Sequence, residues 1–289
     1  MTLESMPDQA NAEQAVAALA SRAQRIETPC GQGSMVWRIW GDGQPVVLAH
    51  GAQGAWSHWI RNIPDLAKDR MVIAPDLPGC GQSALPASID HRAISLALAE
   101  GLQSILGGSP VLDLVGFSFG ASVFAWFANF YPHLTRRLVL VAAGGLGTPV
   151  GRVTLRRASG LPPAEREAVL KGNLLSLMLR HPQSADAMAR HLLSSNAKLF
   201  RLDPMSLVLP DRLLTALPGV SARIDAIWGE FDAPHPPMPQ EQVLRRFQRD
   251  LEFRVIADAG HWVMYEKPGA FNSVLEELLS LPVPAAIGK

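Results

Sequence analysis

A serine in this sequence is flanked by glycines two positions away on either side. The order Gly116-Phe117-Ser118-Phe119-Gly120 follows the short apolar run 111–115 and precedes the apolar, helix-like stretch 121–130. This G-x-S-x-G pattern predicts a strand, a sharp turn and a helix, with the serine at the strained bend. A hydroxyl held there would stand clear of the sheet, next to the free N–H groups of a helix N-terminus. We therefore predict that Ser118 is a nucleophile.

An acid and a base follow two later strands. Asp232 lies in Gly229-Glu230-Phe231-Asp232, directly after the apolar run 224–228, and His261 lies shortly after the run 252–256. The chain order Ser118, Asp232, His261 is the order expected when the nucleophile sits on such a turn. We predict a catalytic triad in which His261 takes the serine proton and Asp232 orients the imidazole.

Three other residues compete for the roles of acid and base. His50 also follows a strand, but it precedes the nucleophile and has no acid after it, so we interpret it as a loop-organising side chain. The rival acids are Glu230, which precedes the turn, and Asp258, which is too close to His261 in sequence to reach around its ring. Asp232 is therefore the preferred acid.

Backbone N–H groups near the serine could stabilise an oxyanion. The loop after the strand 45–49 reads His50-Gly51-Ala52-Gln53-Gly54 and would lie at the same edge of the sheet as Ser118. We predict an oxyanion hole made by the backbone N–H groups of Ala52 and Phe119.

Alternating strands and helices would position these residues. Continuous apolar runs bounded by Gly and Pro predict strands, and helical periodicity predicts helices. The predicted strands are 34–40, 45–49, 71–74, 111–115, 137–142, 224–228 and 252–256, and the predicted helices are 56–66, 91–106, 121–130, 240–249 and 269–281. This alternation predicts an α/β fold with a mostly parallel central sheet, helices on both faces and a ligand site beyond the carboxyl ends of the strands.

The strand rhythm is interrupted once. From 148 to 216 the sequence shows no strand pattern and is helical with proline punctuation, including a helix start at 162–167 and a long helix candidate at 184–200. We interpret 148–216 as an inserted helical lid. It divides the core domain into parts 28–147 and 217–289, and residues 1–27 are predicted to form an N-terminal helical arm.

Composition bounds the partners and the location. The chain has 289 residues, 48% of them hydrophobic, and a formal net charge of zero, which argues against nucleic acid or an anionic membrane as a partner. Cys30 and Cys80 form no disulfide or metal-binding pattern, so we expect no metal and no cofactor. Early acidic residues and the lack of an apolar signal segment predict a cytoplasmic protein. We expect a small-molecule substrate, and a homodimer is left open.

Several segments resemble the signatures of the α/β-hydrolase fold superfamily, over residues 36–281. They are HGAQGAW (50–56), DLPGCGQS (76–83), GFSFG (116–120), WGEFDAP (228–234) and GHWVMYE (260–266). The segments WIRNIPDL (59–66) and AGHWVMYEKPGAFN (259–272) are similar to the meta-cleavage-product hydrolases, which split carbon–carbon bonds in ring-opened aromatics, and to their esterase relatives.

The chain departs from the meta-cleavage-product hydrolases at two places. Ala52-Gln53 stands where those enzymes typically have a glycine-rich oxyanion loop, and Phe117 stands where they have an asparagine before the nucleophile. The resemblance therefore implies a serine hydrolase, and the departures favour a carboxylic ester over a carbon–carbon bond. The dehalogenases of the superfamily use an aspartate nucleophile, which Ser118 disfavours. A cofactor-free acyltransferase, a perhydrolase or a ligand receptor is the alternative of another class.

Substrate specificity would come from the lid and from aromatic residues near the serine. Trp56, Phe117, Phe119 and Trp262 are the aromatic candidates, and core packing is the alternative interpretation for them. Arg190 and Arg201 in the lid could bind a substrate carboxylate, as an arginine does in the carbon–carbon hydrolases of this kind. The alternative for both is a solvated surface residue.

Overall fold

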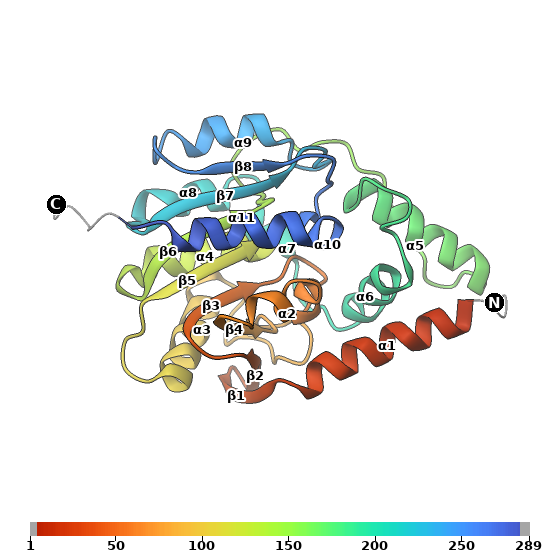
Figure 1. The fold of residues 1–289 in the computed structure, drawn as a ribbon, viewed down its shortest axis with the longest axis horizontal. Helices are drawn as coiled ribbons and strands as arrows, with labels where there is room; N and C mark the ends of the chain where they lie inside the picture. Colours follow the sequence, from red (N-terminus) through yellow and green to blue (C-terminus); the bar gives the residue numbers. More distant parts are fainter. Residues whose placement is uncertain (1–4, 284–289) are drawn as a thin grey trace.

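A mixed eight-stranded sheet forms the centre of the computed structural model, which describes residues 5–283 (Figure 1). The strand order is β1-β2-β4-β3-β5-β6-β7-β8. β2 pairs antiparallel with β1 and with β4, whereas all pairings from β4 onward are parallel. The strands are β1 Gln24–Cys30, β2 Gly33–Trp40, β3 Gln44–Ala49, β4 Arg70–Pro75, β5 Leu112–Phe117, β6 Thr135–Val141, β7 Arg223–Gly229 and β8 Phe253–Ile256. The predicted α/β fold with a mostly parallel sheet is confirmed.

Helices cover both faces of this sheet. Residues of α3, α4, α8 and α9 join one hydrophobic cluster, and residues of α2, α10 and α11 join the cluster on the opposite face. The α-helices are α1 Ser5–Ser21, α2 Ile63–Leu66, α3 His91–Leu106, α4 Phe119–Phe130, α5 Pro163–Leu177, α6 Ala187–Ala197, α7 Pro204–Val208, α8 Arg212–Ala216, α9 Pro237–Leu244, α10 Val263–Glu266 and α11 Pro268–Ser280. Short 3-10 helices are η1 Trp56–Trp59, η2 Pro132–Leu134 and η3 Leu217–Gly219.

The central strand β5 shows why the strands are continuous apolar runs. Leu114 belongs to the cluster that contains Phe124 of α4, and the next residue, Val115, belongs to the cluster that contains Phe271 of α11. Because successive side chains of a strand point to opposite faces, a strand covered on both sides needs apolar residues throughout. The same burial fixes the register that brings the carboxyl ends of β3, β5, β7 and β8 to one edge.

Three elements differ from the sequence predictions. β1 was not predicted, and it crosses the boundary drawn at residue 27 between the arm and the core. The predicted helix 56–66 is instead the 3-10 helix η1 followed by the short helix α2. The helix predicted at 240–249 begins earlier, at Pro237, where a proline fits the first helical turn, and ends at Leu244. Residues 1–4 and 284–289 of the predicted arm and core lie outside the described residues.

The segment between β6 and β7 contains α5 to α8. α7 and α8 pack against the core helix α4, whereas α5 and α6 pack against each other and stand beside the core, with α1 along α6 (Figure 1). We call residues 148–201, which include α5 and α6, the cap. The lid function and the boundaries 148 and 216 stay predictions.

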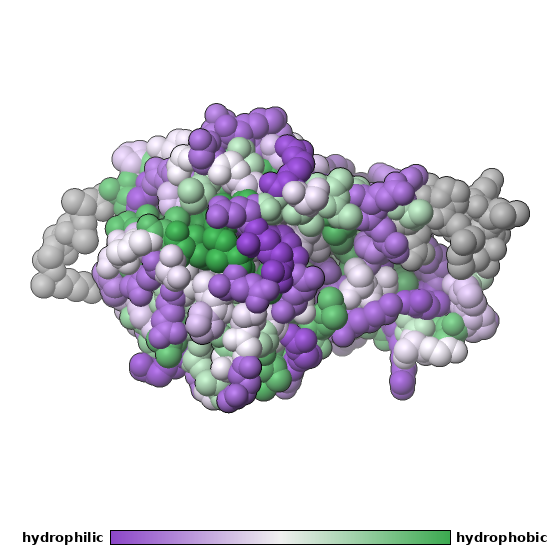
Figure 2. All heavy atoms as spheres, turned by 90° about the horizontal axis from the view of Figure 1, so that it is seen from below, coloured by the Kyte–Doolittle hydropathy of each residue, from purple (hydrophilic) through white to green (hydrophobic). Residues whose placement is uncertain are grey.

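The outer surface is mixed in character. Figure 2 shows hydrophobic residues gathered in a patch on the core half of one face, with hydrophilic residues around it. Within residues 5–283, no helix combines the length and the apolar character that a membrane span requires.

Candidate active site

Ser118 sits at the turn between β5 and α4. Its φ is 52° and its ψ is −111°, a strained conformation for a residue with a side chain. Its backbone N–H donates to the carbonyl oxygen of Val141 on the neighbouring strand at 2.9 Å, which ties the turn to the sheet. The serine is half-buried, whereas its neighbours Phe117 and Phe119 are buried.

The glycines around Ser118 are required by close backbone contacts. A Cβ on Gly116 would lie 2.6 Å from the Cα atom of Ala121, and a Cβ on Gly120 would lie 2.6 Å from the carbonyl oxygen of His50. Neither glycine has a positive φ; within this turn only Ser118 does. The two glycines therefore let the helix start press against the strand and the neighbouring loop, and the serine itself carries the strain.

Ser118, His261 and Asp232 lie in one hydrogen-bonded chain. The Nε2 atom of His261 is 3.2 Å from the Oγ atom of Ser118, and its Nδ1 atom is 2.9 Å from the Oδ2 atom of Asp232. The other carboxylate oxygen of Asp232 accepts the backbone N–H of His235 at 2.8 Å. His261 and Asp232 are almost fully buried, at 4% and 2% exposure, so their bond is shielded from water. The three residues predicted from the sequence are brought together by loops after β5, β7 and β8.

The rival acids point elsewhere. Glu230 accepts the backbone N–H of Asp258 at 2.9 Å. Asp258 forms an ion pair with Lys267 at 3.0 Å, and its carboxylate lies 2.8 Å from the Nε2 atom of His181. Neither carboxylate contacts His261 among the described residues. Asp232 is thus the acid that the geometry places behind the imidazole.

His50 is bonded to loop backbone through both ring nitrogens. Its Nε2 atom accepts the N–H of Leu77 at 3.0 Å, which leaves Nδ1 to donate to the carbonyl oxygen of Gly51 at 2.8 Å. Burial lowers the pKa of His50, so the ring stays neutral and can accept the Leu77 N–H. This arrangement supports its interpretation as a loop organiser.

The loop His50–Gly54 lies against the serine. A Cβ on Gly51 would lie 3.4 Å from the Cβ of Ser118, and the N–H of Gly51 donates to the Nδ1 atom of His58 at 3.3 Å. Within residues 5–283, the N–H groups of Ala52 and Phe119 have no protein acceptor. Two unused donors beside a serine hydroxyl are what an oxyanion hole needs.

His58 and Glu266 are site residues that the sequence analysis missed. Burial, followed by the nearby His50 and His261 rings, holds the pKa of His58 well below its usual value, so His58 can accept the Gly51 N–H. Glu266 is a buried carboxylate that accepts the backbone N–H groups of Gly260 at 2.7 Å, Arg180 at 3.0 Å and His181 at 2.8 Å. It therefore joins the loop that carries His261 to the backbone just after α5.

A second set of contacts strengthens this junction. The N–H of Trp262 donates to the carbonyl oxygen of Met178 at 2.7 Å, and a Cβ on Gly260 would lie 2.8 Å from the backbone nitrogen of Arg180. Only a glycine allows the two backbones to approach this closely. No local sequence pattern predicts these contacts, because the two partners of each contact are about eighty residues apart in the chain.

The aromatic candidates for substrate binding are packed in the core. Trp56 lies against Trp40 with ring centroids 5.2 Å apart, and Trp262 is stacked on Tyr265 at 4.1 Å. Phe117 is 1% exposed and lies beneath His261 at 5.1 Å, and the Phe119 side chain faces the core. These placements favour the packing interpretation, with Phe117 supporting the imidazole.

The two candidate arginines are engaged within the protein. Arg190 pairs with Glu167, and its guanidinium also donates to the carbonyl oxygen of Ala185 at 2.6 Å. Arg201 donates to the carbonyl oxygen of Ser83, which fastens the end of the cap to the loop after β4. Neither guanidinium lines the cavity described next.

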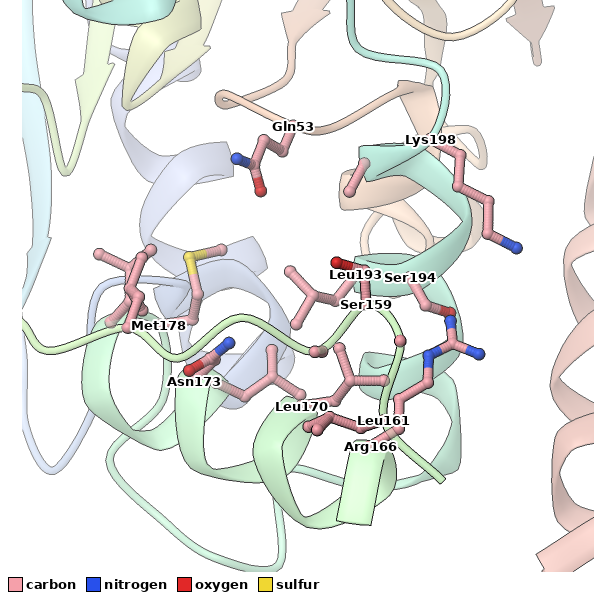
Figure 3. A pocket seen from close by; sticks show the side chains of 16 residues that line it. Gln53, Ser159, Leu161, Arg166, Leu170, Asn173, Met178, Leu193, Ser194 and Lys198 are labelled. Carbon is pink, nitrogen blue, oxygen red and sulfur yellow. The ribbon is translucent and has the colours of Figure 1, made fainter. Parts of the chain in front are cut away.

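A cavity of about 570 Å³ lies under the cap (Figure 3). Its walls are α5, α6, the loop 155–161 and, from the core, Gln53 of the loop next to the serine. Apolar side chains make most of the lining: Leu155, Ala158, Leu161, Leu170, Leu174, Leu177, Met178, Leu193 and Ala197. Since Gln53 neighbours the free N–H of Ala52, the cavity adjoins the loop that faces Ser118.

The groups that could ligate a metal or act as a thiol nucleophile were compared within residues 5–283. Within this part of the chain, no three His, Cys, Asp or Glu side chains group as metal ligands would, and Cys30 and Cys80 are buried free thiols. Burial raises the pKa of both thiols, so neither is poised as a nucleophile.

Comparison with known proteins identifies what these features are similar to. A family model described as the alpha/beta hydrolase family matches residues 46–274. Over 111 residues the chain is 42% identical to the 2-hydroxy-6-oxo-2,4-heptadienoate hydrolase of Pseudomonas putida, covering 37% of this chain and 40% of that protein. It is 28% identical, over 86% of its length and 90% of the relative, to the 2-hydroxymuconate semialdehyde hydrolase of Pseudomonas sp. strain CF600.

Among solved structures, a thermophilic esterase from Thermogutta terrifontis superposes with a TM-score of 0.68. The alignment covers 89% of this chain and 98% of the esterase at 24% sequence identity. A likeness at this identity concerns the fold.

Proposed function

Since this chain belongs to the α/β-hydrolase family, we propose that it hydrolyses a carboxylic ester of a largely apolar acid through an acyl-enzyme on Ser118. The observation that carries the proposal is the chain of hydrogen bonds from Ser118 through His261 to Asp232 at the strained turn. The cavity beside the serine loop is lined mainly by apolar side chains, six of them leucines, which supports an apolar acyl group.

The mechanism follows from the positions of the polar atoms. Nε2 of His261 removes the Ser118 proton as Oγ attacks the ester carbonyl, and Asp232 accepts the Nδ1–H of the imidazolium that forms. The negative charge on the carbonyl oxygen is stabilised by two backbone N–H groups. One belongs to Ala52 in the loop after β3, and the other belongs to Phe119 at the start of α4. His261 then protonates the leaving alcohol, and a water molecule repeats the sequence to release the acid.

A carbon–carbon hydrolase is the second candidate. It is favoured by the 42% identity, over 111 residues, with the Pseudomonas putida heptadienoate hydrolase. The positions of Arg190 and Arg201 weigh against it, because both are engaged with protein groups and are not available to a substrate carboxylate. Phe117 under the imidazole also offers no polar contact to a dienoate.

Turnover of two substrates by wild type and Ser118→Ala tests both candidates. We expect hydrolysis of p-nitrophenyl butyrate to fall by about 10³-fold or more in Ser118→Ala, with the melting temperature unchanged. The same preparations are assayed with 2-hydroxy-6-oxohepta-2,4-dienoate. Rapid bleaching of the dienoate with slow ester turnover would replace the ester proposal by the carbon–carbon reaction, and ester turnover above a tenth of wild type in Ser118→Ala would refute both.

We also propose a cytoplasmic location and a small molecule as the substrate. Two buried free thiols suit a reducing compartment, and a balanced net charge suits neither nucleic acid nor an anionic surface. A homodimer stays open.

A further inference from the structure

The cavity under the cap contains cations without acids. Arg166 and Lys198 line it, and no aspartate or glutamate does. The acids next to Arg166 in the chain are Glu165, which lies outside the lining, and Glu167, which pairs with Arg190. Among the described residues, neither Arg166 nor Lys198 forms an ion pair.

The other polar side chains of the cavity are mostly occupied. Asn173 exchanges two hydrogen bonds of 2.8 Å with the backbone of Arg156, and Ser194 donates to the carbonyl oxygen of His191 at 3.1 Å. Ser159 accepts from the Arg157 guanidinium at 2.7 Å. The groups left for a ligand are the amide of Gln53 and the two cations.

The charge of the cap agrees with this local picture. Residues 148–201 contain nine Lys and Arg but only three Asp and Glu, a surplus of six positive charges in a chain whose formal net charge is zero. A surplus of one sign around a hollow with apolar walls raises the local concentration of ligands of the opposite sign. The cap is therefore suited to an anionic ligand although the whole chain is neutral.

The cations and the catalytic loops lie at different sides of the cavity. In Figure 3, Met178 is on one side and Gln53 projects in from the core loop. Arg166 and Lys198 are on the side away from Met178, where the exposed Lys198 side chain extends outward from α6 at the rim of the cavity. Met178 is the residue whose carbonyl oxygen holds the N–H of Trp262, next to His261. An acyl group entering past Gln53 would thus cross leucine side chains before it reached a cation.

We propose that the cap cavity selects esters of dicarboxylic acids, with the acyl methylene groups against the leucines and the free carboxylate at the outer rim of the cavity, beside Arg166 and Lys198. This inference rests on the proposed ester hydrolysis and names its substrate class. A guanidinium can hold a carboxylate through two hydrogen bonds, and the lysine adds a second positive charge. The methylene groups are removed from water by the leucine walls.

The test compares two chromogenic esters of equal length. Mono-p-nitrophenyl adipate carries the terminal carboxylate, and p-nitrophenyl hexanoate lacks it. Wild type should favour the adipate ester by about fivefold in kcat/KM, as expected for a partly exposed ion pair. The ratio of the two kcat/KM values should fall to about one in Arg166→Gln/Lys198→Gln, because the attraction for the terminal carboxylate is lost. Salt at about 0.5 M should weaken only the adipate reaction.

Lys171→Gln is the matched control, because Lys171 lies on the same helix but does not line the cavity. It should leave the adipate preference intact. Equal kcat/KM for the two esters in wild type, or an equal loss of preference in Lys171→Gln, would overturn the proposal while hexanoate hydrolysis still upheld the ester function.

If wild type hydrolyses neither ester, the proposed function fails, and binding of the two intact esters, measured by calorimetry, tests the cavity alone. Tighter binding of the adipate ester that the double variant abolishes supports the cavity assignment. Equal affinities contradict it.

Discussion

The catalytic loops and the cap cavity adjoin each other but are built in opposite ways. Around Ser118 the backbone is so crowded that a Cβ on Gly116 or Gly120 would overlap main-chain atoms at 2.6 Å, and His261 and Asp232 are nearly buried. In the cap, by contrast, a methyl group added at Gly160 or Gly172 would meet no atom within 4 Å, and the cations of the cavity have no acidic partner among the described residues. The backbone around the proposed nucleophile is therefore fixed by close contacts, whereas the walls of the cap cavity have room for other side chains.

The largest expected effect is on the acid of the catalytic loops. Asp232→Asn should lower kcat by about 10⁴-fold without unfolding the protein, because an amide in place of the carboxylate favours the wrong imidazole tautomer. Ester turnover and thermal melting measure the two quantities. Asp258→Asn is the matched control and should keep most of the activity; the assignment of Asp232 would be wrong if Asp258→Asn were the more damaging change.

Two glycine substitutions contrast the crowded region with the open one. Gly120→Ala should reduce the free energy of unfolding by about 3 kcal/mol, because the methyl group must displace the backbone of the strand β3 end and His50. Gly172→Ala, in the middle of α5 with open space around it, should instead increase it by about 0.5–1 kcal/mol. Urea unfolding measures both, and a similar change at the two sites would remove the contrast between core and cap.

The junction between the two regions gives the next effect. Glu266→Gln should lower the free energy of unfolding by about 2 kcal/mol, since one carboxylate now accepts three backbone N–H groups and an amide cannot accept all of them well. kcat should fall as well, because Gly260 precedes His261. Glu277→Gln breaks only an exposed ion pair with Arg254 and should cost under about 0.5 kcal/mol. Equal losses in the two variants would show that the Glu266 contacts contribute little.

The smallest effect concerns the histidine beside the acid. Burial, with a contribution from the nearby His261 ring, lowers the pKa of His235 to about 4, so below about pH 6.5 the unfolded chain binds its proton more readily than the folded chain. The stability that this neutral imidazole permits is complete above that pH and is lost as the pH falls toward 4. At about pH 5.8, His235→Gln should reduce the acid-dependent loss by about 1 kcal/mol. Urea unfolding at several pH values measures this difference.

The difference between the two regions also explains what the sequence could predict. The strands that end at the site are apolar throughout because both faces of the sheet are covered. The proposed nucleophile, acid and base each follow such a strand. The position of these residues along the chain therefore predicted that they lie at the same edge of the sheet. β1 was not predicted because Gln24–Cys30 is an edge strand with most side chains exposed, so it is not a continuous apolar run. Its pairing with β2 depends on tertiary structure more than on a local pattern.

The features missed or misjudged in the cap and around it depend on contacts between distant segments. In the sequence nothing distinguishes Glu266 from the other acidic residues. Its role depends on the backbone N–H groups of Arg180 and His181, which are brought to it by folding. Arg190 and Arg201 have the charge that a substrate carboxylate would require, but Arg190 is paired with Glu167 and Arg201 donates to the carbonyl oxygen of Ser83. Pairing of charges across a fold leaves no periodic signal in the sequence, so a cation free for a ligand could not be told from a paired one.

The contact between Gly260 and the backbone after α5 sets a rule for recombination with relatives. A cap taken from another hydrolase would bring a different backbone path to the place where residues 178–181 contact Gly260. A small displacement of that backbone would move the loop that contains His261, because there is no free space between the two segments. Chimeras should therefore change sequence before Met178 and leave 178–181 and 260–266 from a single parent. The leucines of the cavity between 155 and 177 could then be exchanged together, while the loops around Ser118 and His261 stay those of one parent.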